Sequence, residues 1–202
     1  MKALYVTDRE AIGDARFAQV LESLAGAPVS VALREKAGTD REKLGVARAA
    51  RQRLGPGVPV YVHRRFDLAL AAGADGVHLP ASGLPLARVR ACAPRGFRVG
   101  VSTHSADEAR EAIAAGADVV VIGPIFDTPS KRAVGAPLGP AALAALPPAA
   151  SHGCEVYAIG GMSEERLPEL DPYRDRIAGI AAIRLFQESA RPRETAERIA
   201  AR

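Results

Sequence analysis

Several polar side chains that could bind a phosphorylated ligand or move a proton directly follow apolar runs in this sequence. His104 comes after the run at residues 97–101, and an imidazole can both accept and donate a proton near neutral pH. Arg34 and Lys36 follow the run at residues 28–33. Two cations spaced two apart on an extended segment point the same way and could clamp an anion. The plainer alternatives are a hydrogen-bonded structural histidine and a solvated charge run.

A second group of candidate ligand-binding residues lies in the loop after residues 119–122. Thr128, Ser130 and Lys131 combine two hydroxyls with an ammonium group. That combination suits phosphate oxygens, although polar residues are also common in surface loops.

Two turns near the C-terminus could offer backbone N–H groups to an anion. Gly160 and Gly161 follow the run at residues 155–159, and residues 181–184 turn into the last helical segment. Barrels often bind a phosphate through the loops after their seventh and eighth strands, and glycine lets the backbone approach an anion closely. This pattern favours a phosphate site between these two turns.

The remaining segments predict a scaffold in which the carboxyl ends of parallel strands meet. Short β-branched runs alternate with Ala-rich helical segments, and AGADGVHL (72–79) and AGADVVVIG (115–123) repeat one helix-then-strand pattern, as in a repeated unit. An open doubly wound sheet usually shows a G-x-G-x-x-G turn after its first strand, which TDREAIGDA lacks. We therefore expect an α/β fold, a single-domain (β/α)8 TIM barrel over residues 1–202. Its strands are expected at residues 4–6, 28–33, 58–62, 76–79, 97–101, 119–122, 155–159 and 177–182.

Helix signals accompany each expected strand. Ser105 and Glu108 have the spacing of a capping box, and Pro140 suits a first helical position. Further helices are expected at residues 14–24, 40–54, 66–72 and 85–93, from Ser163 onward, and in a closing amphipathic helix with Glu188, Thr195 and Ile199.

Composition narrows the class of protein. The chain has 202 residues, 48% of them hydrophobic, and no apolar run of membrane-spanning length. Its net charge of +4 is mild and only 4% of residues are aromatic, so we expect a small anionic ligand and no nucleic acid. MKALYVTD lacks the long apolar core of a signal peptide, so a cytoplasmic location is expected. Cys92 and Cys154 have no metal-ligand spacing and are expected to be reduced residues in or near the core.

The strand ends carry few carboxylates that could hold a metal ion. Asp8 and Asp127 are the candidates, and they come from different parts of the predicted barrel. We therefore expect neither a dedicated Mg²⁺ site nor another cofactor.

Several motifs resemble the thiamine phosphate synthase superfamily, and they occur in order through nearly the whole chain. They are LREK (33–36), DLALAAGADGVHLP (67–80), VGVSTHSADEA (99–109), GPIFDTPSK (123–131) and AIGGM (158–162). The resemblance implies a (β/α)8 barrel with one of two activities. Synthases join a pyrimidine pyrophosphate to a thiazole phosphate with Mg²⁺, whereas TenI-type tautomerases aromatise a thiazole phosphate carboxylate without a metal.

Departures from the synthase pattern favour the tautomerase branch. His63 and Arg64 replace the synthase Asn-Asp, Gly83 replaces a second aspartate that holds Mg²⁺, and Ala32 replaces a glutamine. An arginine cannot ligate a cation. Two stretches of the sequence are also more similar to the tautomerases than to the synthases: HLPASGLPLARVRACAP and AIGGMSEERL.

The expected function is thus a metal-independent thiazole tautomerase, an isomerase acting on a small phosphorylated thiazole. By resemblance, His104 would be the acid/base, Arg34 and Lys36 would receive the substrate carboxylate, and Gly160, Gly161, Ile183 and Arg184 would hold its phosphate. The synthase loop that binds pyrophosphate is matched by Thr128, Ser130 and Lys131. The tautomerase hypothesis does not explain this match. The alternatives are a thiamine phosphate synthase, which would need Mg²⁺, and a non-catalytic barrel that binds phosphate ligands. Barrels of this group often form homo-oligomers, but one chain shows no interface.

Overall fold

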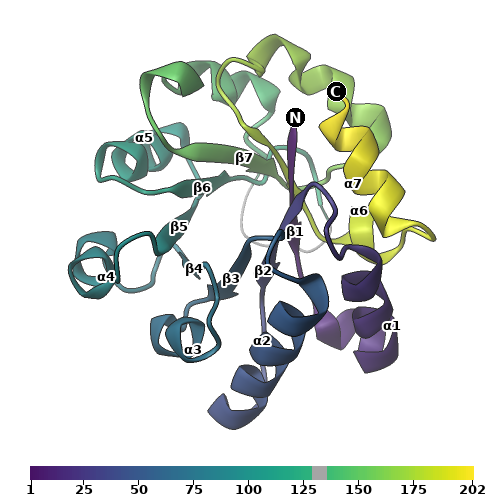
Figure 1. Ribbon diagram of the computed structural model, residues 1–202. Coiled ribbons are helices and arrows are strands. Elements are labelled where there is room, and N and C mark those ends of the chain that lie inside the picture. Colours follow the sequence, from purple (N-terminus) through teal and green to yellow (C-terminus); the bar gives the residue numbers. More distant parts are fainter. Residues whose placement is uncertain (129–135) are drawn as a thin grey trace.

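The computed structural model describes residues 1–128 and 136–202. Its strands pair in parallel and in chain order, and the last strand pairs with the first, which closes a barrel. In Figure 1 the strands gather at the centre and the helices surround them. The predicted (β/α)8 barrel is therefore confirmed. The strands are β1 Lys2–Val6, β2 Val29–Leu33, β3 Val60–His63, β4 Gly76–Leu79, β5 Arg98–Thr103, β6 Val119–Ile122, β7 Glu155–Ile159 and β8 Gly179–Ala182.

The α-helices lie outside the barrel and bury one face against the strands. The α2 helix has the predicted bounds because both of its ends carry clear signals. At its start Thr39 Oγ1 accepts a hydrogen bond from Glu42 N at 3.3 Å, and the Glu42 carboxylate accepts one from Thr39 N at 2.6 Å. Gly55 ends the helix with a positive φ of 74°. The α-helices are α1 Arg9–Ser23, α2 Asp40–Leu54, α3 Phe66–Ala71, α4 Leu86–Cys92, α5 Ala106–Ala114, α6 Arg184–Gln187 and α7 Pro192–Ala200.

Four helix predictions need correction. The α1 helix begins at Arg9, five residues before the predicted start, with a break at Gly13 (φ 73°). The segments after β6 and β7 are 3-10 helices, η2 Pro140–Ala145, η3 Ala149–Ser151 and η4 Glu164–Tyr173. The η4 segment contains two prolines, which cannot donate the backbone hydrogen bonds of an α-helix. The closing segment is split into α6 and α7, so Glu188 lies between two helices.

Two layers of buried side chains hold the barrel together. The larger one lies between the strands and the surrounding helices, and the smaller one fills the barrel interior because alternate strand residues point inward. The interior cluster consists of Leu4, Ala32, Tyr61, Val119, Val121, Tyr157 and Ala181.

A charged network occupies the amino-terminal end of the barrel interior. Glu155 accepts hydrogen bonds from Lys2 Nζ at 2.7 Å and Tyr157 Oη at 2.8 Å, and it lies 3.1 Å from Arg98 Nη2. Burial alone would raise the pKa of Glu155, but the bonds from Lys2 and Tyr157 and the charge of Arg98 lower it overall. The carboxylate therefore stays ionised and ties three strands together at this end.

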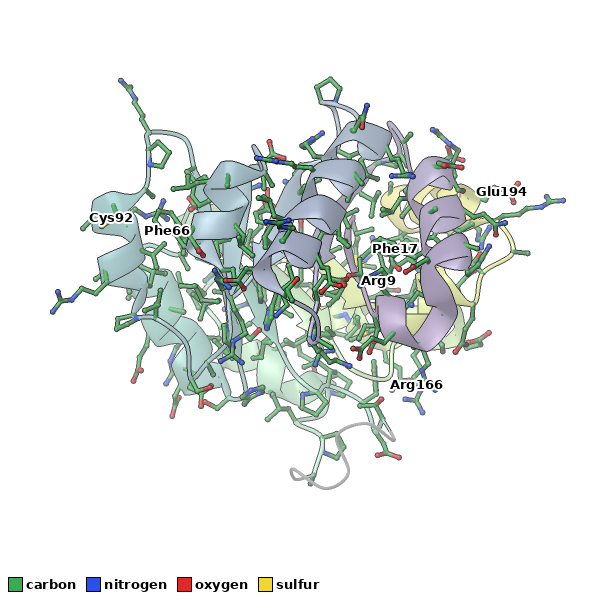
Figure 2. All side chains as sticks on the ribbon, turned by 90° about the horizontal axis from the view of Figure 1, so that it is seen from below. Arg9, Phe17, Phe66, Cys92, Arg166 and Glu194 are labelled. Atoms are coloured by element: carbon green, nitrogen blue, oxygen red, sulfur yellow. The ribbon has the colours of Figure 1, made fainter. Side chains whose placement is uncertain are left out.

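The two cysteines differ in exposure. Cys154 is buried and Cys92 is exposed, and both are free thiols. Cys92 lies at the outer side of α4 (Figure 2), so the expectation of a core or near-core position is confirmed for Cys154 and wrong for Cys92. Among the described residues, no helix is both long and apolar enough to cross a membrane.

Candidate functional site

A cavity of about 770 Å³ opens at the carboxyl ends of the strands, and all eight strands contribute to its wall. This is the end at which barrel enzymes place their chemistry, and the volume lies in the range of small-molecule sites. The barrel brings most of the predicted site residues together here. His104, Arg34, Lys36, Thr128, Gly160, Gly161, Ile183 and Arg184 all line the cavity, whereas Ser130 and Lys131 lie outside the described residues.

His104 stands at the end of β5 with one ring nitrogen already engaged. Its Nδ1 lies 3.0 Å from the carbonyl oxygen of Gly123. Because a carbonyl oxygen can only accept, we assign the proton of the neutral ring to Nδ1. The backbone holds the residue as well, since His104 N donates to Glu108 Oε2 at 2.7 Å and Ser105 Oγ accepts from Glu108 N at 3.1 Å. In this orientation Nε2 is the acceptor that the ring can offer to a ligand.

Arg34 and Lys36 converge as their spacing predicts, and they converge on a carboxylate of the protein. Lys36 Nζ donates to Asp8 Oδ2 at 2.7 Å, and Arg34 Nη1 lies 3.6 Å from the same oxygen. Buried Thr7 fixes the turn after β2, because its Oγ1 accepts a hydrogen bond from Arg34 N at 2.9 Å. Asp8 thus occupies the position at which an anionic ligand would meet this pair.

The two glycines after β7 line the cavity, and packing alone explains why they are glycines. A Cβ on Gly160 would lie 2.6 Å from Pro124 Cα, and a Cβ on Gly161 would lie 2.6 Å from the carbonyl oxygen of Asp127. Both residues also have positive φ values, 103° and 63°. The phosphate role expected for these glycines stays a prediction.

The floor of the cavity contains a polar group to which the sequence analysis assigned no role in ligand binding: His63, His78 and Ser102, from the neighbouring strands β3, β4 and β5. His78 Nε2 lies 2.8 Å from Ser102 Oγ, and the rings of His63 and His78 stack with centroids 6.0 Å apart. Gly100 makes room for them, since a Cβ there would lie 2.6 Å from His78 Nδ1. The available signal was the alternation of strand residues, because His63 and His78 occupy paired positions of β3 and β4.

Both floor histidines are uncharged at neutral pH. Burial lowers the pKa of His63 to about 4, helped by the nearby charges of Arg34 and Arg64. Burial also lowers the pKa of His78 to about 3, helped by His63. The floor therefore offers neutral hydrogen-bonding groups, while the positive charge lies at the rim.

The donor set of the cavity does not match a divalent metal ion. Its wall contains two carboxylates, Asp8 and Glu188, and Asp8 is already engaged by two cations. Among residues 1–128 and 136–202, no three His, Cys, Asp or Glu side chains come together as a metal site. Mg²⁺ prefers several oxygen ligands in octahedral geometry, so the described residues do not fit it.

The fold and the site define a class: (β/α)8 barrels with a cationic ligand cavity at the carboxyl ends of the strands. The family model described as "Thiamine monophosphate synthase" matches residues 3–186, and the chain belongs to this family.

Individual relatives agree with that assignment. A thiamine-phosphate synthase of Methanoculleus marisnigri is 39% identical over 185 residues, which cover 89% of this chain and 86% of the relative. The thiamine-phosphate synthase of Methanoregula boonei is 38% identical over 184 residues, covering 89% and 84%. A thiamine phosphate pyrophosphorylase structure from Pyrococcus furiosus superposes with a TM-score of 0.81 at 28% identity and covers 99% of this chain and 94% of that one.

These names overturn the expected tautomerase activity and its isomerase class. The relatives are named as synthases, which was the alternative, a transferase. Arg64 and Gly83, in place of the synthase aspartates, bear on how a metal could bind, and they do not identify the reaction.

Proposed function

We propose that this protein is a thiamine-phosphate synthase, a transferase that joins a pyrimidine pyrophosphate to a thiazole phosphate. The bond between the pyrimidine-bearing carbon and a pyrophosphate oxygen breaks, a bond to the thiazole nitrogen forms, and pyrophosphate leaves. Two observations together carry the proposal. The chain matches named synthases over nearly its full length, and the motif residues Arg34, Lys36 and Thr128 line one cavity.

The rim cations suit the leaving group of this reaction. Negative charge develops on the departing pyrophosphate, and fixed cations stabilise such charge in the transition state. Arg34 and Lys36 would supply this charge by exchanging their contacts with Asp8 for contacts with the pyrophosphate. Arg184 lies on the rim as well, at the start of α6, where it would meet the second phosphorylated substrate.

The cavity interior suits the uncharged pyrimidine and thiazole rings of the two substrates. Its apolar wall includes Val6, Val121 and Ile159, and its floor holds two neutral histidines. A mostly apolar wall with a few polar groups is the usual character of a pocket for a heteroaromatic ring. His104 Nε2 would accept a hydrogen bond from a bound substrate and so orient it.

Magnesium is the ion that the family resemblance implies, and the described donor set does not fit it. The residues that bind and orient the substrates are those of the rim and the floor.

Product formation tests the proposal directly. Purified protein is mixed with the pyrimidine pyrophosphate and the thiazole phosphate, and thiamine phosphate is measured by mass spectrometry and pyrophosphate by a coupled assay. We expect both products in equal amounts and only when both substrates are present. Arg34→Ala should lower the rate by about 100-fold through loss of charge stabilisation. Arg95→Ala, in the turn before β5 at the opposite end of the barrel, is the matched control and should leave it unchanged. Absence of thiamine phosphate, with or without added Mg²⁺, would contradict the proposal.

A further inference from the structure

Arg64 is an exposed arginine that directly follows β3 and His63 of the cavity wall, and its backbone conformation is unusual. Its φ is 66°. Among the described residues, no other residue apart from glycines has a positive φ. A long side chain rarely adopts this conformation, and such strain is concentrated at functional sites. The backbone is held in place because Arg64 N donates to the carbonyl oxygen of His78 at 2.9 Å.

The position of Arg64 places its charge next to the rim cations. Leu33 pairs with Val62 across β2 and β3, so the residues after them, Arg34 and His63, end neighbouring strands, and Arg64 follows directly. The charges of Arg34 and Arg64 both help to lower the pKa of His63, which lines the cavity wall.

Arg64 and Arg184 also differ from most other arginines in their partners. Arg9, Arg51, Arg65, Arg90 and Arg98 each contact a carboxylate. Within residues 1–128 and 136–202, by contrast, no hydrogen bond or ion pair involves the side chains of Arg64 and Arg184. Their positive charge is therefore available to a ligand.

We propose that Arg64, together with Arg34 and Lys36, binds the pyrophosphate group as a bare anion, without a divalent metal ion. The guanidinium fork matches phosphate oxygens and carries its charge permanently. The inference rests on the proposed function for the identity of the anion, and on this chain's own residues for the way in which that anion is held.

Calorimetric titration with inorganic pyrophosphate tests this inference without any turnover. We expect the wild-type protein to bind pyrophosphate equally well, within about twofold, in EDTA and in excess Mg²⁺. Arg64→Ala should weaken binding about tenfold through loss of a charge-assisted contact. Arg95→Ala changes the net charge by the same amount at the other end of the barrel and should change the affinity less than twofold.

Two further substitutions separate the charge of Arg64 from its backbone strain. Arg64→Gly relieves the positive φ, so the protein should be as stable as wild type in thermal unfolding yet bind pyrophosphate as weakly as Arg64→Ala. Arg64→Asp should bind about 100-fold more weakly in EDTA and should recover part of that loss in Mg²⁺.

The outcomes distinguish this inference from the proposed function. Wild-type binding that needs Mg²⁺, no pyrophosphate binding in either buffer, or equal affinities for Arg64→Ala and Arg95→Ala would overturn the inference. Product formation together with metal-dependent pyrophosphate binding would leave the synthase proposal standing. Metal-free binding without product formation would support the inference and refute the synthase proposal.

Discussion

Replacement of His63 by asparagine should make the stability of the protein less sensitive to acid. The folded protein keeps His63 uncharged, with a pKa lowered from 6.5 to about 4, first by burial and then by the charges of Arg34 and Arg64. In the unfolded chain the same imidazole takes up a proton below about pH 6.5. The unfolded state therefore binds more protons than the folded state between these two pH values, and acid favours unfolding.

The size of the effect follows from the two pKa values of His63. Its contribution to stability is fully present above pH 6.5 and is lost as the pH falls toward 4. At about 1.36 kcal/mol per pH unit, the separation between 6.5 and about 4 corresponds to about 3 kcal/mol. This is a large fraction of the roughly 5–15 kcal/mol by which domains are stable. His78, with its pKa of about 3, should add a loss of similar size that persists in the variant.

Urea unfolding at pH 7.0, 5.5 and 4.5 measures this contribution. Wild-type protein and His63→Asn should differ in the slope of unfolding free energy against pH, with the variant losing about 2 kcal/mol less between pH 6.5 and 4.5. The Arg34→Ala protein provides a second test, because removal of one cation should raise the pKa of His63 in nitrogen-15 NMR titrations. Equal slopes for the wild-type and His63→Asn proteins would show that His63 is not held neutral by the fold.

Three further predictions concern stability and anion binding. Glu155→Gln should lower the free energy of unfolding at pH 7 by about 2 kcal/mol, and thermal unfolding should show a midpoint about 4–8 °C lower. Because the pKa of Glu155 is lowered in the fold, that difference should shrink as the pH falls below about 4.5. Gly100→Ala should lower the free energy of unfolding, measured in urea, by about 1–3 kcal/mol, because the new Cβ would clash with the His78 ring. Asp8→Asn removes the carboxylate that Arg34 and Lys36 contact, so calorimetry should show inorganic pyrophosphate binding about threefold to tenfold more tightly.

The fold could be predicted because its signals are local. The apolar run at residues 119–122 is a strand with the predicted bounds, as expected for a strand buried on both faces. The α2 helix likewise has a capping residue at one end and a glycine at the other. The segment after β7 was predicted less well, although Pro168 and Pro172 in the sequence already argued against a regular α-helix there.

The rim of the site could be predicted more readily than the part that the floor histidines play, for a physical reason. Rim residues such as Arg34 and His104 follow strands, so their place at the barrel end follows from topology alone. Floor residues such as His63 and His78 lie within or at the end of strands, where one residue of register decides whether a side chain faces the cavity or the helices. Their uncharged state depends on burial and on charges from other strands, which one sequence does not display.

The residue at position 64 does not by itself distinguish the two activities, for an electrostatic reason. A departing pyrophosphate needs positive charge beside it, and either a bound cation or a guanidinium can supply that charge. An arginine at position 64 would therefore change the source of the charge while the bond that breaks stays the same. An acid/base histidine at position 104 is equally compatible with orienting a substrate, since its Nδ1 is fixed by Gly123 and its Nε2 is left to accept. Substitution of Arg64 therefore tests how the pyrophosphate is held, whereas product formation from both substrates tests which reaction takes place.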